Sequence, residues 1–262
     1  MKRFFLLIYG FSLALFARDY ALIVGIGNYQ NPYIPRLSQL NVDINNYHQI
    51  LSQWKISPKY VYQLKNENAT RQSILYYLSL ITNNIQTGDR FLMFFSGHGT
   101  SLFDENYSQQ LQRANLTEIM SESGAILPYD FNPSIQSIGA TLLIGKRDLR
   151  PYIQTIDSKG VNSLIVFDAC FSENSIRNPY NEYINRTPNI LTENDNYPYR
   201  NITYIASSIL ESQSGKFSPI LKKCLGESTF LDSLKICINN NIGESMQIPA
   251  VLANKNKVFL FK

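Results

Sequence analysis

The amino-acid sequence predicts a single α/β domain built around a mostly parallel β-sheet that is flanked by helices. Strand-like and helix-like segments alternate along the chain, and this order is typical of parallel strands joined by helical crossovers. Two strand-like segments, residues 91–95 and 164–167, are continuous apolar runs, as expected for strands buried on both faces. With 262 residues, of which 44% are hydrophobic and 17% charged, the chain can bury a core of its own.

The other predicted elements flank these two buried strands. A helix after residue 39 has an apolar face at helical spacing, and Thr70 can cap a second amphipathic helix that ends before the turn at Gly88. Further strands are predicted at residues 20–24, 60–64, 202–206 and 258–261, and further helices at 217–225 and 231–238. Two long segments, 100–145 and 173–201, show little periodicity, which favours functional loops or cleavable linkers.

The first 17 residues have the layout of a secretory signal peptide. Lys2 and Arg3 precede an apolar run at residues 4–16, and the small residue Ala17 follows it. This run of 13 residues is short for a membrane span, which needs about 20. We therefore expect an exported protein, periplasmic or secreted, whose mature domain comprises residues 18–262. The alternatives are a buried first helix or an uncleaved anchor, and only the anchor would attach the protein to a membrane.

Charge and cysteine content narrow the possible functions further. The net charge is +4, but without Lys2 and Arg3 the 24 basic residues become 22 against 20 acidic ones. This balance argues against a nucleic-acid binder. Three cysteines leave one thiol over in an oxidising compartment. We expect Cys224 and Cys237 to form a disulfide and Cys170 to stay free, with two buried thiols as the alternative.

His98 and Cys170 are the residues that suggest chemistry. His98 lies between two glycines after the first buried strand, and Cys170 follows the second buried strand at the equivalent place. Taken separately, His98 is explained equally well as a structural histidine in a turn, and Cys170 is explained better as a buried apolar side chain. Together, at one edge of a parallel sheet, an imidazole and a thiol can perform nucleophilic catalysis. The other histidine, His48, is predicted to be a surface residue of a helix.

A set of short segments around these residues resembles the caspase-like cysteine peptidases, and the metacaspase branch more than the animal caspases. The segments are YALIVGIGNY at 20–29, NVD at 41–43, FFSGHG at 94–99, LPYD at 127–130, DACFS at 168–172, ASS at 206–208 and GKFS at 215–218. They occur in the family's order. The chain departs from metacaspases at Phe171-Ser172-Glu173, where His-Ser-Gly is usual, and at Leu40, which replaces a small or thiol residue.

The resemblance implies a role for each site residue. Cys170 attacks the scissile carbonyl, His98 transfers protons, and the backbone N–H groups of Gly99 and Cys170 form the oxyanion hole. The substrate-binding pocket is expected to include Leu40, Asp43, Ser96 and Asp168. Two acids in one pocket favour substrates with Arg or Lys at the cleaved position. Without the resemblance, Asp43 reads as a solvated helix-start residue and Asp168 as a turn former.

No cofactor is expected to be required. Some metacaspases use calcium, but Asp104, Glu105 and Asp130 form no diagnostic ligand spacing, and no other metal site is indicated. The partners are therefore protein or peptide substrates. The alternative is a catalytically inactive caspase-like binding module at the cell envelope. Retention of His98, Cys170 and both pocket acids favours the enzyme, because a binding role does not require that combination.

Overall fold

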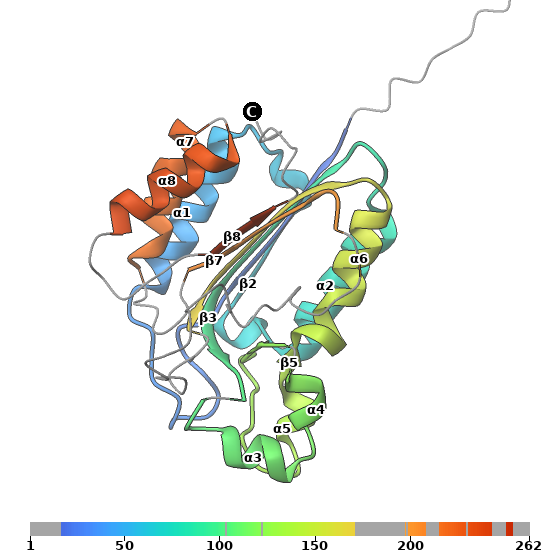
Figure 1. Cartoon of the computed structure of the whole chain (residues 1–262), viewed down its shortest axis with the longest axis vertical. Helices are drawn as coiled ribbons and strands as arrows, with labels where there is room; N and C mark the ends of the chain where they lie inside the picture. Colours follow the sequence, from blue (N-terminus) through green and yellow to red (C-terminus); the bar gives the residue numbers. More distant parts are fainter. Residues whose placement is uncertain are drawn as a thin grey trace, which may run out of the picture.

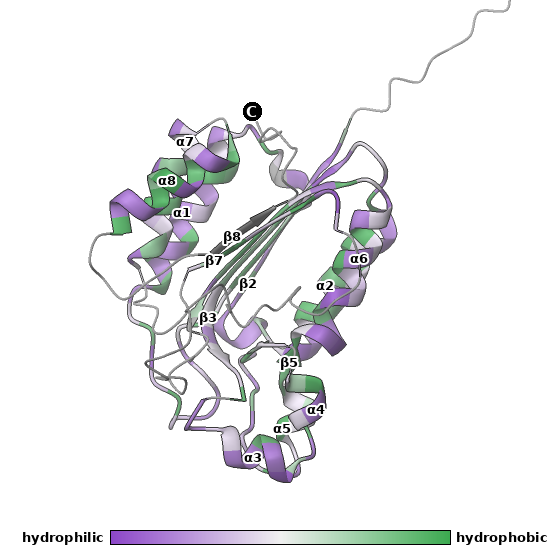
Figure 2. Ribbon diagram, viewed as in Figure 1, coloured by the Kyte–Doolittle hydropathy of each residue, from purple (hydrophilic) through white to green (hydrophobic). Residues whose placement is uncertain are grey.

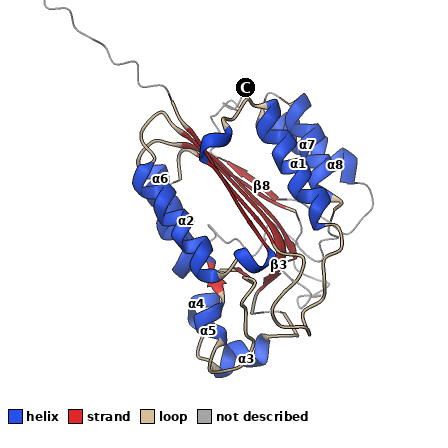
Figure 3. Cartoon of the chain, turned by 180° about the vertical axis from the view of Figure 1, so that it is seen from behind, coloured by secondary structure: helices blue, strands red, loops and turns tan. Residues whose placement is uncertain are grey.

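The chain forms three layers, with one β-sheet between two groups of helices (Figures 1 and 3). The computed structural model describes residues 17–102, 104–121, 123–170, 197, 199–207, 215–228, 230–242 and 250–253. One face of the sheet is covered by α1 (Leu40–Gln53), α7 (Phe217–Glu227) and α8 (Leu231–Ile242). The other face is covered by α2 (Arg71–Asn84) and α6 (Arg150–Ser158). The predicted α/β fold with helices on both faces is confirmed.

The sheet is mostly parallel, as predicted, with one antiparallel strand at its edge. Its strands are β1 (Asp19–Gly25), β2 (Val61–Lys65), β3 (Arg90–Thr100), β6 (Asn162–Cys170), β7 (Ile202–Ala206) and β8 (Ala250–Ala253). Their order in space is β2-β1-β3-β6-β7-β8, and β8 runs antiparallel to β7. The sequence did not predict β8, and the predicted strand at 258–261 lies outside the described residues. The long central strands β3 and β6 therefore lie side by side.

The central strands are longer than their apolar cores. β3 pairs with β6 from Arg90 opposite Asn162 to His98 opposite Cys170. The sequence predicted that His98 and Cys170 follow the strands, but both lie within them. Gly97 allows β3 to continue there. A side chain at this position would place its Cβ 2.7 Å from the ring of Phe95. The pairing of β3 with β6 thus extends as far as the predicted catalytic pair.

The core consists of two apolar layers, one on each face of the sheet. Successive residues of β3 alternate between them, with Phe91, Met93 and Phe95 in one layer and Leu92 and Phe94 in the other. Both faces of the strand are buried, which explains its continuous apolar sequence. The helices complete the layers, and Figure 2 shows hydrophobic and hydrophilic sides on the long helices.

The helix boundaries follow from local sequence signals. Thr70 caps α2 as predicted, because its side chain accepts a hydrogen bond from the Ser73 N–H. The other end of α2 is capped by Lys159, whose ammonium donates to the carbonyls of Thr82 and Ile85 at 2.5 and 3.1 Å. A cation at a helix C-terminus also interacts favourably with the helix dipole. These contacts fix α2 against the loop that follows α6.

The segment between β3 and α6, predicted to be irregular, contains short elements at one end of the molecule (Figure 1). These are α3 (Ser108–Arg113), α4 (Thr117–Met120), β4 (Ala125–Ile126), α5 (Ile138–Thr141), β5 (Leu143–Ile144) and a π-helical turn at Gly145–Leu149. β4 pairs antiparallel with the end of β3 and with β5. Elements of two to six residues are too short to produce a periodic apolar pattern, so the sequence did not show them.

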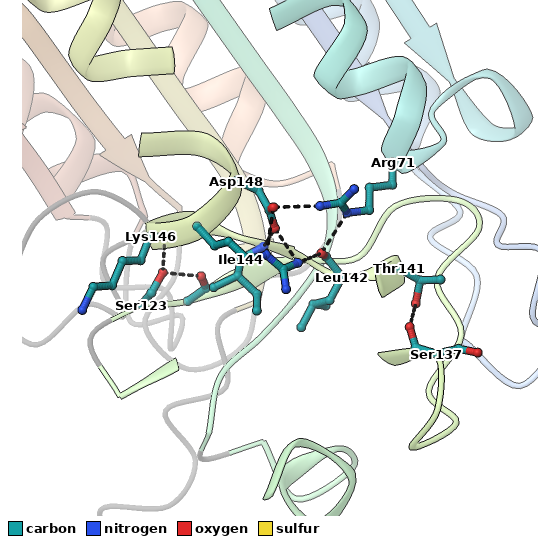
Figure 4. A network of polar contacts seen from close by, with 10 residues as sticks. Arg71, Ser123, Ser137, Thr141, Leu142, Ile144, Lys146 and Asp148 are labelled. Atoms are coloured by element: carbon teal, nitrogen blue, oxygen red, sulfur yellow. Dashed lines mark hydrogen bonds and ion pairs between the residues drawn. The ribbon is translucent and has the colours of Figure 1, made fainter. Parts of the chain in front are cut away.

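Asp148 ties this segment to helix α2 (Figure 4). One carboxylate oxygen accepts hydrogen bonds from Arg71 at 2.7 Å and from Arg147 at 2.9 Å. The other oxygen accepts from Arg147 and from the Ile144 N–H, both at 2.8 Å. Both arginines also donate to the Leu142 carbonyl. The start of α2, strand β5 and the start of α6 are thereby joined through one buried carboxylate.

We predict that Asp148→Asn lowers the free energy of unfolding by about 2 to 3 kcal/mol, because charge-assisted hydrogen bonds from two arginines are lost together. Urea unfolding followed by circular dichroism would measure it. Asp232→Asn, in the exposed first turn of α8, should change stability by less than about 0.5 kcal/mol. Equal midpoints for the two variants would contradict this role for Asp148.

Cys224 of α7 and Cys237 of α8 form a disulfide, with their Cα atoms 5.6 Å apart. The expected pairing is confirmed, and the alternative of two buried thiols is wrong. Cys224 is fully buried in the apolar layer that α7 and α8 share. The bridge therefore joins two helices that also pack on each other.

We predict that the double substitution Cys224→Ala, Cys237→Ala lowers the free energy of unfolding by about 3 kcal/mol, the value expected for closing a loop of this size. Urea unfolding with and without a reductant would measure the effect. The reductant should lower the wild-type midpoint and leave that of the double variant unchanged. A wild-type midpoint that does not respond to full reduction would contradict the prediction.

Two sequence predictions fall largely outside the part of the chain that the structure describes. These are the signal peptide, of which only Ala17 is included, and the long segment 173–201, of which only the last few residues are included. Among the described residues, none of the helices has the length and apolar character needed to cross a membrane.

Candidate active site

The backbone brings His98 and Cys170 together. They are Cα partners at the carboxyl ends of β3 and β6, which are adjacent parallel strands. Neighbouring strands lie about 4.8 Å apart, so residues in register are close even though 72 positions separate them in the sequence. The predicted pair thus lies at the edge of the sheet where α/β proteins bind ligands.

The His98 imidazole is oriented by a backbone carbonyl. Its Nε2 lies 2.8 Å from the carbonyl oxygen of Pro35. Because a carbonyl oxygen only accepts hydrogen bonds, Nε2 carries the proton in this contact and Nδ1 of the neutral ring has the free lone pair. The sequence suggested no third group beside the pair. It could not have done so, because any residue type can offer this carbonyl.

The backbone of His98 is also held from both sides. Its N–H donates to the hydroxyl of Tyr29 at 2.7 Å, and its carbonyl accepts from the Leu127 N–H at 3.0 Å. The rings of Tyr29 and His98 are tilted against each other with centroids 5.3 Å apart. Tyr29 and Leu127 belong to two of the segments that carried the family resemblance. These segments therefore serve to position His98.

Burial lowers the pKa of His98. The hydrogen bond to Pro35 and the negative charge of Asp104 act in the opposite direction without cancelling the effect. The carboxylate of Asp104 is itself held by Thr100 at 2.9 Å and by Asn106 at 3.0 Å. A lowered pKa keeps the imidazole neutral near pH 7, and the neutral ring is the form that can accept a proton from a thiol.

We predict that the His98 imidazole titrates below pH 6.5, the value of a free histidine side chain, because burial disfavours its cation. The measurement is NMR titration of the ring protons in a His48→Gln, Cys170→Ala variant. That variant has one imidazole and no nearby thiol to titrate with it. The folded protein should also lose stability as the pH falls through this lowered pKa. A midpoint at or above 6.5 would show that burial does not control the ring.

Gly99, a predicted oxyanion residue, is buried in β3 directly after His98 and opposite Ile126 of β4. Its backbone is therefore fixed by the small antiparallel ladder at the end of the sheet. The other predicted donor, the N–H of Cys170, belongs to the last residue of β6. The two groups lie at the same sheet edge, and their role stays a prediction.

Three of the four predicted pocket residues come together on the α1 side of the sheet. Ser96 of β3 donates a hydrogen bond of 2.9 Å from its hydroxyl to Asp43 of α1, and its Cα partner in β6 is Asp168. All three are buried, with relative exposures of 0% for Asp43, 2% for Ser96 and 3% for Asp168. Asp43 is thus not a solvated helix-start residue, and Asp168 is a strand residue and not a turn former.

The buried phenol of Tyr47 is influenced by both acids. Its buried side chain stacks on Phe94 with ring centroids 4.7 Å apart. Burial raises the pKa of Tyr47 well above its usual value, and the negative charges of Asp168 and then Asp43 raise it further. Both acids therefore act on the same buried phenol.

Two further polar residues belong to this site and were not predicted from the sequence. Ser218 of α7 donates to the other oxygen of Asp43 at 2.6 Å, and the Asn46 amide of α1 donates to the Ser218 hydroxyl at 3.1 Å. Ser218 was part of the segment that resembled the family, but nothing in the sequence connected it to Asp43, 175 positions away. Asn46 carried no signal.

Leu40, the fourth predicted pocket residue, packs over the end of β1. A Cβ at Gly25 would lie 2.8 Å from Leu40 Cδ1, and one at Gly27 would lie 3.1 Å from Leu40 Cδ2. The two glycines therefore make room for this side chain, which is almost fully buried. Its effect on the width of the pocket stays a prediction.

Two of the acids considered for calcium accept hydrogen bonds from other residues. Asp104 binds Thr100 and Asn106, and Asp130 accepts a hydrogen bond of 2.8 Å from the Arg71 N–H. In the described part of the chain, no group of three or more His, Cys, Asp or Glu side chains is placed to hold a metal ion.

The fold and the site together define a class of protein. It is the class of three-layer α/β proteins that hold a histidine and a cysteine side by side at one sheet edge, as a cysteine peptidase does. The family model for the caspase domain matches residues 18–258. The chain therefore belongs to the caspase domain family, whose members are cysteine peptidases.

Solved structures agree on the fold. Caspase-1 from Spodoptera frugiperda is 12% identical and superposes with a TM-score of 0.62, covering 94% of this chain and 90% of that one. A protein from Geobacter sulfurreducens is 15% identical, with a TM-score of 0.59 and coverage of 90% and 92%. At these identities the likeness concerns the fold alone. No curated protein sequence matches this chain.

Proposed function

We propose that this protein is a cysteine endopeptidase of the metacaspase type that uses His98 and Cys170 as its catalytic dyad and cleaves after Arg or Lys. The observation that carries the proposal is the register of β3 and β6, which places His98 opposite Cys170. Membership in the caspase domain family supports the reaction type. The buried acids Asp43 and Asp168 support the preference for basic residues.

In the proposed reaction, the Cys170 thiol gives its proton to Nδ1 of His98, and its sulfur attacks the scissile carbonyl carbon. The backbone N–H groups of Gly99 and Cys170 stabilise the oxyanion of the tetrahedral intermediate. When the intermediate collapses, the C–N bond breaks, the amine leaves with the proton from His98, and a thioester remains. Water then attacks the thioester, its proton returns through His98, and the thiol and the new carboxylate are released.

Pro35 supports both proton transfers. Its carbonyl holds Nε2–H of His98, so Nδ1 stays directed to the reaction in each half of the cycle. The same contact stabilises the imidazolium that forms transiently, because the carbonyl dipole is directed at the charged ring. His98 therefore requires no carboxylate as a third member. The proposed mechanism involves no cofactor.

We predict that Cys170→Ala and His98→Ala each abolish cleavage and leave the fold intact, because both residues lie at the end of the sheet and not in the middle of the core. Hydrolysis of an Arg peptide and thermal unfolding would be measured together. In the wild type, Cys170 should react with iodoacetamide, whereas Cys224 and Cys237 are oxidised. Full activity in either variant would exclude the dyad.

We predict that Asp168→Ala lowers kcat/KM for Arg substrates by more than tenfold, which corresponds to about 1.4 kcal/mol or more. Alkylation of Cys170 by a small neutral reagent should change much less. Arg should be cleaved better than Lys, because its planar fork can bind both acids. The matched control is Asp157→Ala, which removes a buried carboxylate that binds the backbone of Arg200 and Asn201 at the other end of the sheet. A preference for Asp or a neutral residue would contradict the pocket.

The competing function is a catalytically inactive binding module at the cell envelope. A covalent probe with an Arg recognition residue separates the two functions. Failure of Cys170 to react in a folded protein would favour the binding module. We further propose that the protein is exported after cleavage of the segment 1–17, which an N-terminal sequence starting at Arg18 in the mature protein would establish.

A further inference from the structure

The specificity acid Asp43 is held by hydrogen bonds from two separate elements. Its Oδ2 accepts from Ser96 of β3 at 2.9 Å, and its Oδ1 accepts from Ser218 of α7 at 2.6 Å. The Asn46 amide donates to the Ser218 hydroxyl at 3.1 Å and so determines where that hydroxyl directs its proton. Asp43, Ser96 and Ser218 are 0%, 2% and 0% exposed, and Asn46 is 5% exposed. This buried network is outside the proposed proton transfers of His98 and Cys170.

From this network we propose that Ser218 is a positioning residue for substrate specificity, which fixes the Asp43 carboxylate in the orientation that binds a basic side chain. This inference rests on the proposed function, because it concerns the same pocket. Ser218 does not contact the reacting atoms. It acts through Asp43, and Asn46 supports it.

The chemistry of the donors favours this role over a purely structural one. A hydroxyl that donates to a carboxylate stabilises its charged form and so counteracts the cost of burying it. The charged form of Asp43 is the form that a guanidinium or ammonium group would bind. Ser218 is also the second residue of α7, where the positive end of the helix dipole favours an anion.

The contact of Ser218 with Asp43 depends on the position of α7 in the folded chain. α1 and α7 pack side by side on the same face of the sheet (Figure 1). The first turn of α7 thus supplies a polar contact to the first turn of α1, while the rest of both helices contributes apolar residues to the core. The pocket is built from both the first and the last third of the sequence.

The test compares peptides that differ only in Arg or norleucine at the cleaved position. For Ser218→Ala, the ratio of kcat/KM for Arg to that for norleucine should fall about tenfold, a factor that equals 1.4 kcal/mol. The loss should appear in KM for the Arg peptide, with kcat within about twofold of the wild type, because a binding contact and not a chemical step is weakened. Alkylation of Cys170 by iodoacetamide should be unchanged.

Three controls separate positioning from stability. Ser163→Ala removes a buried hydroxyl at the amino-terminal end of β6, and its Arg preference should equal that of the wild type. Thr and Val have the same shape, so retention of the Arg preference in Ser218→Thr and its loss in Ser218→Val would assign the effect to the hydroxyl, even if the alanine variant does not fold. In an Asp43→Asn background, Ser218→Ala should change the ratio less than twofold, because its target charge is absent.

The outcomes distinguish this inference from the proposed function. A wild type that cleaves neither peptide, or that prefers norleucine, would overturn the proposed function itself. A wild type that prefers Arg, together with Ser218→Ala and Ser218→Val variants that keep the full preference, would overturn the role of Ser218 alone. A loss of preference that is equal in Ser218→Thr and Ser218→Val would also overturn it, because the hydroxyl would then not be the cause.

Discussion

The pairing of β3 with β6 is the constraint on which the rest of the structure depends. It extends over nine residue pairs, from Arg90 and Asn162 at one end to His98 and Cys170 at the other. Because side chains alternate between the faces of a strand, the same register that buries Phe94 with Val166 also determines where Ser96, Asp168 and His98 lie. A shift of one residue would exchange the faces. The pairing of β3 with β6 thus determines both the core packing and the geometry of the site.

The polar cluster on the α1 side is the most demanding part of this arrangement. Buried carboxylates are costly unless hydrogen bonds compensate for the lost water. Asp43 is compensated by hydroxyls from β3 and α7, and the helix dipole at the first turn of α1 favours its charge. A protein that needed only stability would be served as well by apolar residues there. In the proposed function, these acids bind the basic side chain of a substrate.

The opposite face and the end of the sheet supply rigidity. Asp148 joins α2, β5 and α6 through two arginines and one backbone N–H, and the segment around Leu127 binds the carbonyl of His98. Tyr29 holds the N–H of the same residue. The His98 backbone is therefore fixed by loops that are themselves anchored. In the proposed function, this fixation keeps His98 in place before a substrate arrives.

The sequence by itself determined the layered α/β fold, the two central strands and Thr70 as a helix cap. It also predicted a site of His98, Cys170, Asp43, Ser96 and Asp168, whose roles stay a prediction. These features rest on local signals, namely apolar runs, capping residues and short segments. Such signals extend over a few residues and can be recognised without knowing which segments are in contact in the folded protein. Only the tertiary structure decided the full length of β3, strand β8, the short elements after β3, the Pro35 carbonyl beside His98, and the contact of Ser218 with Asp43. The physical reason is that every residue type has a backbone carbonyl, so the sequence does not mark the one that binds His98. Likewise, Ser218 has no visible partner in the sequence until folding brings α7 against α1.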